Sequence, residues 1–410
     1  MTKEFFKVLD VDQVLDLRHR FEPVSSEEVR LEVATGRILA EEVTAAGNLP
    51  GFARSIVDGF AVRAASTFGA SESSPALFRV VGSVAMGECP CASIAPEEAM
   101  RIATGGMLPS GADSVVMLEH ADLLDETSIE VFRSLAPGQN MIAAGEDFEN
   151  GARIASPGRR LRPQDAGVLA AFGRTRVKAF RQPVVGIIST GDEIVPADAV
   201  PGLAQIRDMN SYTLAGLAAQ AGALPTAFGI VRDEFAPLHA ACGQALEQCD
   251  LVLISGGSSV GARDYTIEVI GAFAESEILV HGIAISPGKP TILARVGGKA
   301  LWGLPGHVVS AMIVFTRIVR PFLLHIAGMA APRVEDIRVP ARLTRNVASA
   351  QGRTDFIRVR LLRRERELWA EPVLGKSGLI NTMVKSDGLI EIGKNVEGLD
   401  EGATVEVILF

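Results

Sequence analysis

The feature that most constrains the fold is an alternation of strand-like and helical runs that begins at Pro183. Short apolar runs predict strands at residues 183–189, 226–231, 250–254, 278–281 and 291–296. Helical spacing of apolar residues predicts helices at residues 211–221, 235–248 and 265–273, and a longer helix that begins at His307. This order is typical of a doubly wound α/β domain with a mostly parallel sheet, so we predict that class for this region.

The rest of the chain predicts smaller modules on both sides of the α/β region. Residues 11–19 have helical spacing, and a serine pair before Glu28 forms a capping-box pattern that predicts a second helix running toward Glu42. Short apolar runs separated by Gly, Pro and Ser predict a β-rich module at about 50–140, and a helix follows at 163–172. Near the C-terminus, strands are predicted at residues 336–339, 355–361, 368–372 and 403–409. With 410 residues the chain exceeds the roughly 250–300 at which one core stops growing, so several domains are expected.

Charge and composition argue against a nucleic-acid-binding protein. The chain has 40 Lys plus Arg against 49 Asp plus Glu, a formal charge of −9, and no basic stretch offsets it. Aromatic residues make up only 5%, which is too few to favour stacking platforms for single strands. Neither phosphate backbones nor stacked bases are therefore expected ligands.

Cysteine usage and the apolar segments predict a cytoplasmic protein without a membrane span. The four cysteines lack the spacing of metal ligands, and we interpret them as reduced thiols. The N-terminal residues contain no apolar core of signal-peptide length. The most apolar long segment, residues 307–328, contains Arg317, Arg320 and His325, which favours a buried helix.

Three loops of the α/β region follow predicted strands, where open α/β sheets bind their ligands. In the first, Gly191 permits a tight turn, and the adjacent acids Asp192 and Glu193 can hold a divalent ion. The alternative for this loop is a capped turn with solvated acids. The second loop, residues 255–261, holds two Gly and three Ser before Gly261, and its free N–H and O–H donors can cradle an anion. Asp264 then either caps the next helix or orients a metal or leaving group.

The third loop, residues 303–307, precedes the long helix, whose N-terminus favours an anion. Just upstream, Lys289 stands on a stiff turn before Pro290, which suits a point-charge contact to an anion, although solvated turn lysines are commoner. His307 is interpreted as a capping or packing residue. In the first half of the chain, Asp58 and Asp147 lie beside glycines in segments that could be simple turns.

Taken together, these segments resemble one family, the molybdopterin molybdenumtransferases (MoeA family), whose eukaryotic relatives include the C-terminal domain of gephyrin. The resembling segments occur in family order at residues 55–61, 104–119, 145–147, 189–193, 209–222, 255–266, 287–290 and 303–310. Each segment is weak evidence alone, but the set covers nearly the whole chain.

The resemblance implies a multidomain α/β protein of four parts. They are a helical linker domain at residues 1–48 and 146–180, a β-rich inserted domain at 49–145, a molybdopterin-binding three-layer α/β domain at 181–330 and a C-terminal β-barrel-like domain at 331–410. It also implies a homodimer whose sites are built from both subunits, with a molybdopterin adenylyltransferase as substrate donor and no nucleic-acid or membrane partner.

The implied activity is that of a transferase in molybdenum cofactor biosynthesis. Its substrates would be adenylylated molybdopterin and molybdate, its product AMP, and its cofactor Mg²⁺. Matching motifs place catalytic roles on Asp58, Asp147, Glu193, Asp233, Asp264 and Lys289. They place binding of the pterin substrate on Thr190, Gly191, Asp192, Asn210, Ser255, Gly256, Gly257, Ser258, Gly261, Pro305, Gly306 and Ser310. Oxyanion contacts fall on Ser286, Lys289, Pro290, Arg358, Ser377 and Asn381, and metal ligands on Asp192, Glu193 and Asp264.

One departure from the family pattern bears on the oxyanion. Many members carry a lysine immediately before the Pro-Gly of the lysine turn, whereas this chain has Ser286. The substitution removes one positive charge near the oxyanion and leaves the choice between molybdate and tungstate open. A non-catalytic molybdopterin-binding or scaffolding paralogue is the alternative from another class. The small α/β adenylyltransferase that makes the adenylylated pterin is a third, disfavoured because its domain matches only one part of this chain.

Overall fold

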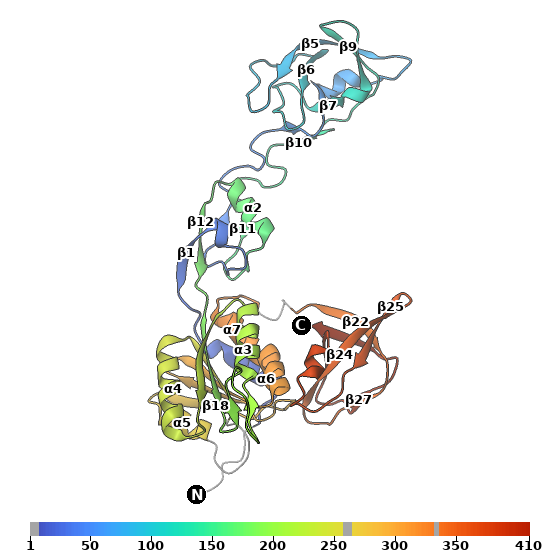
Figure 1. The fold of residues 1–410 in the computed structure, drawn as a ribbon. Helices are drawn as coiled ribbons and strands as arrows, with labels where there is room; N and C mark the ends of the chain where they lie inside the picture. Colours follow the sequence, from blue (N-terminus) through green and yellow to red (C-terminus); the bar gives the residue numbers. More distant parts are fainter. Residues whose placement is uncertain (1–7, 257–264, 332–335) are drawn as a thin grey trace. The chain divides into compact units, whose positions relative to one another are not determined.

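The computed structural model describes residues 8–256, 265–331 and 336–410 (Figure 1). The chain forms two compact units. The first combines Met1–Glu41, Pro157–Leu161 and Val177–Phe410, and the second combines Glu42–Ser156 with Arg162–Arg176. The second unit is thus inserted into the sequence of the first, and each unit is described by itself below.

The first unit contains a six-stranded sheet in the order β16-β13-β17-β21-β20-β18. Its strands are β13 (Val184–Thr190), β16 (Leu224–Val231), β17 (Leu251–Ser255), β18 (Ser276–His281), β20 (Ile292–Val296) and β21 (Lys299–Leu304). β13 is parallel to β16 and β17, and β17 is parallel to β21, whereas β20 is antiparallel to β18 and β21. The predicted mostly parallel α/β sheet is confirmed, and β21 is a strand that the alternation had not indicated.

Helices cover both faces of this sheet (Figure 1). They are α3 (Asn210–Gln220), α4 (Phe235–Gln248), α5 (Tyr265–Ala272) and the long helix that follows β21. Alternate residues of β17 point into two separate cores: Leu253 packs with residues of α3 and the long helix, and Ile254 packs with residues of α4 and α5. A strand that is covered on both faces has a continuous run of apolar residues, so β17 could be predicted from the sequence.

The long apolar helix consists of α6 (Val308–Val314), a π-helical turn η5 (Phe315–Val319) and α7 (Arg320–Ile326). Among the described residues it is the one helix long and apolar enough to cross a membrane by length and composition. Within the fold, 67% of its most apolar stretch is buried, and its residues Phe315 and Phe322 lie in one core with Trp302 of β21. The apolar residues of this helix therefore form part of the core of the α/β domain.

The helix predicted from the capping-box pattern before Glu28 is wrong. Ser26–Arg30 form strand β1, which pairs with β12 (Arg176–Phe180), and only a short 3-10 turn, η2 (Leu31–Val33), follows. The partner strand comes from a distant part of the chain, so a local capping pattern carried no information about it. The first predicted helix is present as α1 (Val11–Asp16), where Asp10 N donates to the Gln13 side chain at 3.0 Å.

The second unit is built on a six-stranded sheet in the order β7-β4-β6-β5-β9-β8, which confirms the β-rich character predicted for this stretch. Its strands are β4 (Gly59–Val62), β5 (Ala76–Val84), β6 (Glu98–Ile102), β7 (Ser114–Met117), β8 (Ala121–Leu123) and β9 (Ser128–Val131). A Cβ at Gly59 would lie 1.8 Å from Val116 O, so β4 and β7 approach closely because this residue is glycine. Helix α2 (Pro163–Ala171) begins with proline in its first turn, as predicted.

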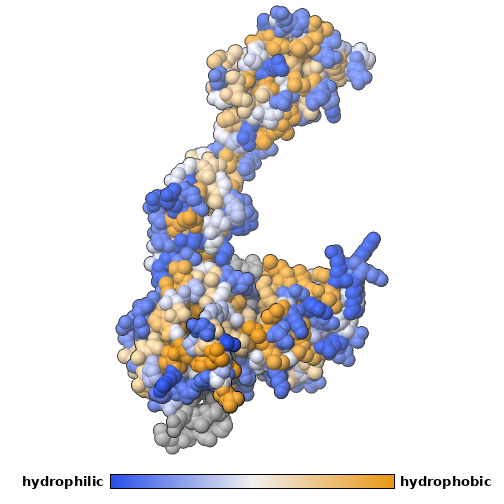
Figure 2. All heavy atoms as spheres, in the orientation of Figure 1, coloured by the Kyte–Doolittle hydropathy of each residue, from blue (hydrophilic) through white to orange (hydrophobic). Residues whose placement is uncertain are grey.

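The C-terminal part of the first unit is a closed β-barrel. Its strands are β22 (Arg338–Leu343), β24 (Thr354–Arg364), β25 (Glu367–Pro372), β26 (Gly388–Ile392) and β28 (Thr404–Leu409). They follow the order β24-β25-β22-β28-β26, and β26 pairs back with β24, so the sheet has no free edge. Hydrophilic side chains gather at the β24–β25 hairpin (Figure 2), where Arg364 lies 4.9 Å from the ring centre of Trp369.

Candidate functional site

Loops at the carboxyl ends of β13, β17 and β21 lie next to one another because these strands are parallel neighbours. Asn210, the first residue of α3, joins two of the loops: its Nδ2 donates to Ser255 Oγ at 2.6 Å and to Gly306 O at 2.8 Å. Its Oδ1 is buried and has no hydrogen-bond partner among the described residues. An unpaired buried acceptor is costly, so this atom is suited to accept a hydrogen bond from a ligand.

The start of α3 is set by local hydrogen bonds. Asp208 is buried, and its Oδ1 accepts the Ser211 backbone N–H at 3.1 Å, which caps the first turn. Ser189, at the end of β13, shares a 2.9 Å hydrogen bond between its Oγ and Ser211 Oγ. These contacts hold Asn210 toward the neighbouring loops.

Gly256 lies where two of the loops approach most closely. Its φ is +114°, and a Cβ built there would lie 2.0 Å from Thr190 O. Gly306 is also near, with 3.7 Å between its ideal Cβ and the Gly256 Cα. The close approach of the β13 and β17 loops therefore depends on glycine at position 256.

Three carboxylates gather beside the first loop. Asp233 N donates to Asp192 Oδ1 at 3.4 Å, and burial together with the charges of Asp192 and Glu193 raises the pKa of Asp233 above its ordinary value, with the Thr190 hydroxyl opposing the rise. Asp233 Oδ1 is buried and meets no hydrogen-bond partner in the described chain. Burial of Asp233 disfavours its charged form first, and the two exposed carboxylates beside it add repulsion.

Oxygen donors of this kind fit Mg²⁺, and a divalent cation would relieve the repulsion among the carboxylates. The described residues hold no preformed group of three or more His, Cys, Asp or Glu at metal-binding geometry. The donor chemistry of Asp192, Glu193 and Asp233 suits the ion, although their arrangement is not a preformed metal site.

We expect Asp233→Asn to raise the melting temperature in metal-free buffer at pH 7. A carboxyl with a raised folded-state pKa contributes stability below its ordinary pKa of 3.8 and loses it as the pH rises through the folded value. The neutral amide removes this loss, so the advantage of the variant should shrink as the pH falls toward 3.8. Thermal melts of both proteins between about pH 3.5 and about pH 8 measure this difference in melting temperature.

The same variant provides a test of ion binding. Added Mg²⁺ should raise the melting temperature of the wild-type protein and have a smaller effect on Asp233→Asn, because ligand binding stabilises only the state that binds. Equal responses of the two proteins to Mg²⁺ would remove Asp233 from the ion site.

A pocket of about 520 Å³ opens between the α/β domain and the barrel. From the α/β domain it is lined by the turn 286–290 together with Pro305, His307 and Ser310, and from the barrel by Gln351, Gly352, Arg353 and Ser377. His307 Nδ1 lies 2.8 Å from Ser377 Oγ, and Val309 N donates to Ser377 O at 3.1 Å. The predicted residues Ser286, Lys289, Pro290, Ser310 and Ser377 therefore meet in one pocket.

The turn that carries Lys289 is held in place by its backbone. Lys289 O accepts the N–H groups of Ile283 and Thr291, both at 2.9 Å. A Cβ at Gly288, whose φ is +121°, would lie 2.3 Å from Val314 Cγ2, so the turn packs directly on α6. The charged end of Lys289 is exposed at the pocket, which suits it to meet an anion.

Arg353 and His307 line the pocket although the sequence did not single them out as ligand-binding residues. Arg353 Nε lies 2.9 Å from Oδ1 of the buried Asp355, which fixes the direction of the guanidinium. Arg353 reaches the pocket because β19 (Ile285–Ser286) pairs in parallel with Thr354 and Asp355 of β24. That pairing is a long-range contact, and a basic residue before a strand was its only sequence signal.

Two residues predicted to contact the oxyanion do not line this pocket. Arg358 is buried in the barrel, where its Nη2 donates to Gly375 O at 2.9 Å and burial lowers the pKa of its guanidinium. Its Nε has no hydrogen-bond partner among the described residues. Asn381 begins the short helix α8 (Asn381–Val384) and is exposed. Their roles at the oxyanion stay predictions.

The remaining predicted residues lie elsewhere. Gly257, Ser258, Gly261 and Asp264 fall outside the described residues. Asp58 and Asp147 belong to the second unit. Asp58 Oδ1 accepts Thr104 N at 2.7 Å and Thr104 Oγ1 at 3.1 Å.

Family models match three successive parts of the chain. Residues 9–173 match the MoeA N-terminal region (domain I and II), residues 186–325 match a probable molybdopterin binding domain, and residues 340–410 match the MoeA C-terminal region (domain IV).

Individual relatives agree with these matches. The chain is 33% identical to a molybdopterin molybdenumtransferase of Bacillus subtilis, over 94% of this chain and 90% of the relative. It is 34% identical to a putative molybdopterin biosynthesis protein of Methanocaldococcus jannaschii, over 93% and 92% of the two chains. A crystal structure of a molybdopterin biosynthesis MoeA protein from Pyrococcus horikoshii is similar with a TM-score of 0.85 and 30% identity, over 98% of this chain and 100% of that one.

Proposed function

Since this chain belongs to the MoeA family of molybdopterin molybdenumtransferases, we propose that it inserts molybdate into adenylylated molybdopterin and releases AMP. One observation carries the proposal: a single loop connects the two candidate binding regions. Gly306 O accepts the Asn210 side chain beside the β17 loop, while the next residue, His307, lines the 520 Å³ pocket and contacts Ser377. A substrate held by the first region would extend toward an oxyanion in the second.

Different residues bind the pterin substrate and the oxyanion in this proposal. Asn210 Oδ1 is an open acceptor for the amino or N–H groups of a pterin, and the donor-rich strand ends around Ser255 hold its phosphate end. Lys289 supplies positive charge to the molybdate, with Arg353 fixed by Asp355 as a second cation at the same pocket.

AMP release breaks the phosphate–phosphate link of the adenylylated pterin. Water adds to one phosphorus, the bridging P–O bond breaks, and the two fragments leave with one phosphate each. Mg²⁺ held by Asp192, Glu193 and Asp233 would neutralise the charge that develops on these phosphates. The carboxylates of this chain that the ion leaves free would orient the water.

We further propose that the protein acts in the cytoplasm as a homodimer and receives its substrate from a molybdopterin adenylyltransferase. One support is the family match. The other is that Asp58 and Asp147 lie in the second unit, so the second unit of a partner subunit would supply these acids to the site. Sedimentation at micromolar protein should give the mass of two chains, and a stable single chain would contradict the dimer.

Incubation with adenylylated molybdopterin, Mg²⁺ and molybdate tests the reaction. AMP should appear in proportion to enzyme, and omission of molybdate or chelation of Mg²⁺ should suppress it. A protein that binds the pterin but releases no AMP above an enzyme-free control would instead be the non-catalytic binder.

The residue at position 286 bears on whether the protein binds molybdate or tungstate. Ser286 is half-buried and lines the pocket beside Lys289. We expect Ser286→Lys to tighten molybdate binding several-fold, because one additional unit charge about 4 Å away contributes about 1 kcal/mol in water. Calorimetric titrations with molybdate and tungstate measure the change. Unchanged affinity for both anions would show that position 286 does not face the anion.

A further inference from the structure

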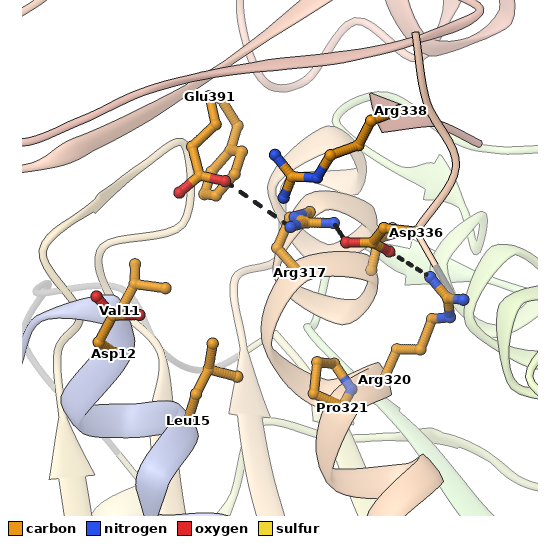
Figure 3. A pocket seen from close by; sticks show the side chains of 11 residues that line it. Val11, Asp12, Leu15, Arg317, Arg320, Pro321, Asp336, Arg338 and Glu391 are labelled. Atoms are coloured by element: carbon orange, nitrogen blue, oxygen red, sulfur yellow. Dashed lines mark hydrogen bonds and ion pairs between the residues drawn. The ribbon is translucent and has the colours of Figure 1, made fainter. Parts of the chain in front are cut away.

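Arg317 lies in the π-helical turn η5 and reaches toward the barrel through a second, smaller pocket (Figure 3). Its Nη1 donates to Asp336 Oδ2 at 2.8 Å, and its Nη2 lies 3.8 Å from Glu391 Oε2. Its guanidinium carbon is 5.6 Å from the ring centre of Phe356. Only 11% of its side chain is exposed. One residue of the α/β domain therefore contacts three residues at the base of the barrel.

The contacts of Arg317 lie beside the strand pairing that builds the oxyanion pocket. Phe356 and Glu391 are register partners in the β24–β26 ladder. Phe356 is the residue after Asp355, which pairs with Ser286, and Thr354 N donates to Ala284 O at 2.9 Å. Phe356 thus connects Arg317 to the start of β24, which directly follows Arg353.

Asp336 strengthens the same connection from another side. It lies at the entry of the chain into the barrel, and its second oxygen, Oδ1, accepts Arg320 Nη1 at 3.1 Å. Figure 3 shows Arg317 and Arg320 reaching this carboxylate from successive turns of the helix. Its side chain is only 13% exposed, so the two arginines compensate a carboxylate that water reaches poorly. Asp12 and Arg338 are the other charged residues that line the pocket.

We propose that Arg317 is a positioning residue for the oxyanion pocket: it seats the barrel on the α/β domain so that Arg353 and Ser377 meet the Lys289 turn. This inference rests on the proposed function, because it assigns the 520 Å³ pocket to molybdate. Arg317 does not line that pocket and acts on it only through Phe356, Glu391 and Asp336. A planar guanidinium meets two carboxylates and an aromatic face in fixed directions, whereas a lysine ammonium is a point charge without that geometry.

The direct test is molybdate binding by Arg317→Gln and Arg317→Lys, measured by calorimetry with molybdate alone. We expect the affinity to fall about tenfold in the glutamine variant and by less in the lysine variant, while affinity for adenylylated molybdopterin stays unchanged. Arg342→Gln is the matched control, because Arg342 makes an ion pair with Glu367 at 3.3 Å in the same barrel and does not line either pocket. Wild-type affinity in folded Arg317→Gln would overturn the proposal.

Hydrogen exchange separates failure of this inference from failure of the proposed function. Backbone amides at 283–286 and 353–357 should exchange faster in Arg317→Gln than in wild type or Arg342→Gln, because the β19–β24 pairing loosens. If wild-type protein binds no molybdate, the proposed function is wrong. If exchange at these amides is the same in Arg317→Gln as in wild type, the positioning role of Arg317 is wrong.

A double-mutant cycle provides a second route should Arg317→Gln fold poorly. Asp336→Asn should show the same loss of molybdate affinity, and Arg317→Gln combined with Asp336→Asn should be no worse than either alone. Additive losses would show that the two residues act independently, against the proposed connection.

Discussion

Alanine at position 256 is expected to reduce AMP release at least about 100-fold and to lower the melting temperature by several degrees. The new Cβ would lie 2.0 Å from Thr190 O, a backbone atom that cannot rotate away. The φ of +114° adds strain on the order of 1–3 kcal/mol for a residue with a side chain. The β13 and β17 loops must then separate, and Asn210 loses its simultaneous contacts to Ser255 and Gly306. Steady-state AMP release and thermal melts measure both effects.

Two other glycines separate the possible causes. Gly229 of β16 has a φ of +82° and no atom of the described chain within 4 Å of an added Cβ, so Gly229→Ala reports the conformational strain alone. Gly216 in α3 has neither a positive φ nor a described neighbour within 4 Å. Gly216→Ala therefore measures the effect of an added methyl group without strain or close contact. If Gly256→Ala lost no more activity than Gly229→Ala, the close contact with Thr190 would be unimportant.

Methionine in place of Lys289 is expected to weaken molybdate binding about 10- to 100-fold, because a hydrogen bond to a charged group contributes roughly 1.5–3 kcal/mol. Lys289 stands on a turn whose backbone is held by Thr291 and packed on α6, so the side chain starts from a fixed point beside the pocket. Methionine retains much of the length and apolar volume and removes only the charge. Calorimetry with molybdate, with pterin affinity measured in parallel, determines whether the loss is confined to the oxyanion.

Lys385→Met is the control for this loss of charge. Lys385 is an exposed lysine of the same unit that does not line the pocket. Its replacement changes the net charge equally and should leave molybdate affinity unchanged. An equal loss in both variants would mean that the anion responds to the overall charge of the protein.

Local patterns were sufficient where an element is buried on both faces. The runs at β13 and β17 are mostly apolar, and all their residues except Val184 are buried, so the strands were predicted close to their observed bounds. Helix α4 was predicted with the bounds it has, Phe235–Gln248. The failures are elements whose state depends on a remote partner: β1 was predicted as a helix, and β21 was partly assigned to a loop.

The candidate site shows the same division. The loops at the strand ends could be identified from glycine and hydroxyl residues after apolar runs, because parallel neighbours place their carboxyl ends together. Arg353 could not, because its place depends on the pairing of β19 with β24. Arg358 had the same charge and a similar position in the sequence, yet it lies in the barrel interior against Gly375.

The sequence by itself determined the α/β class, the strand-end loops, the lysine turn and the family, because these depend on periodicity, turn chemistry and the order of short motifs. Only the tertiary structure decided that Asn210 joins two loops, that the barrel completes the pocket around Lys289, and that Arg317 contacts the barrel at Phe356 and Asp336. Contacts of this kind join residues far apart in the chain. They come from packing and burial, which local residue patterns do not specify.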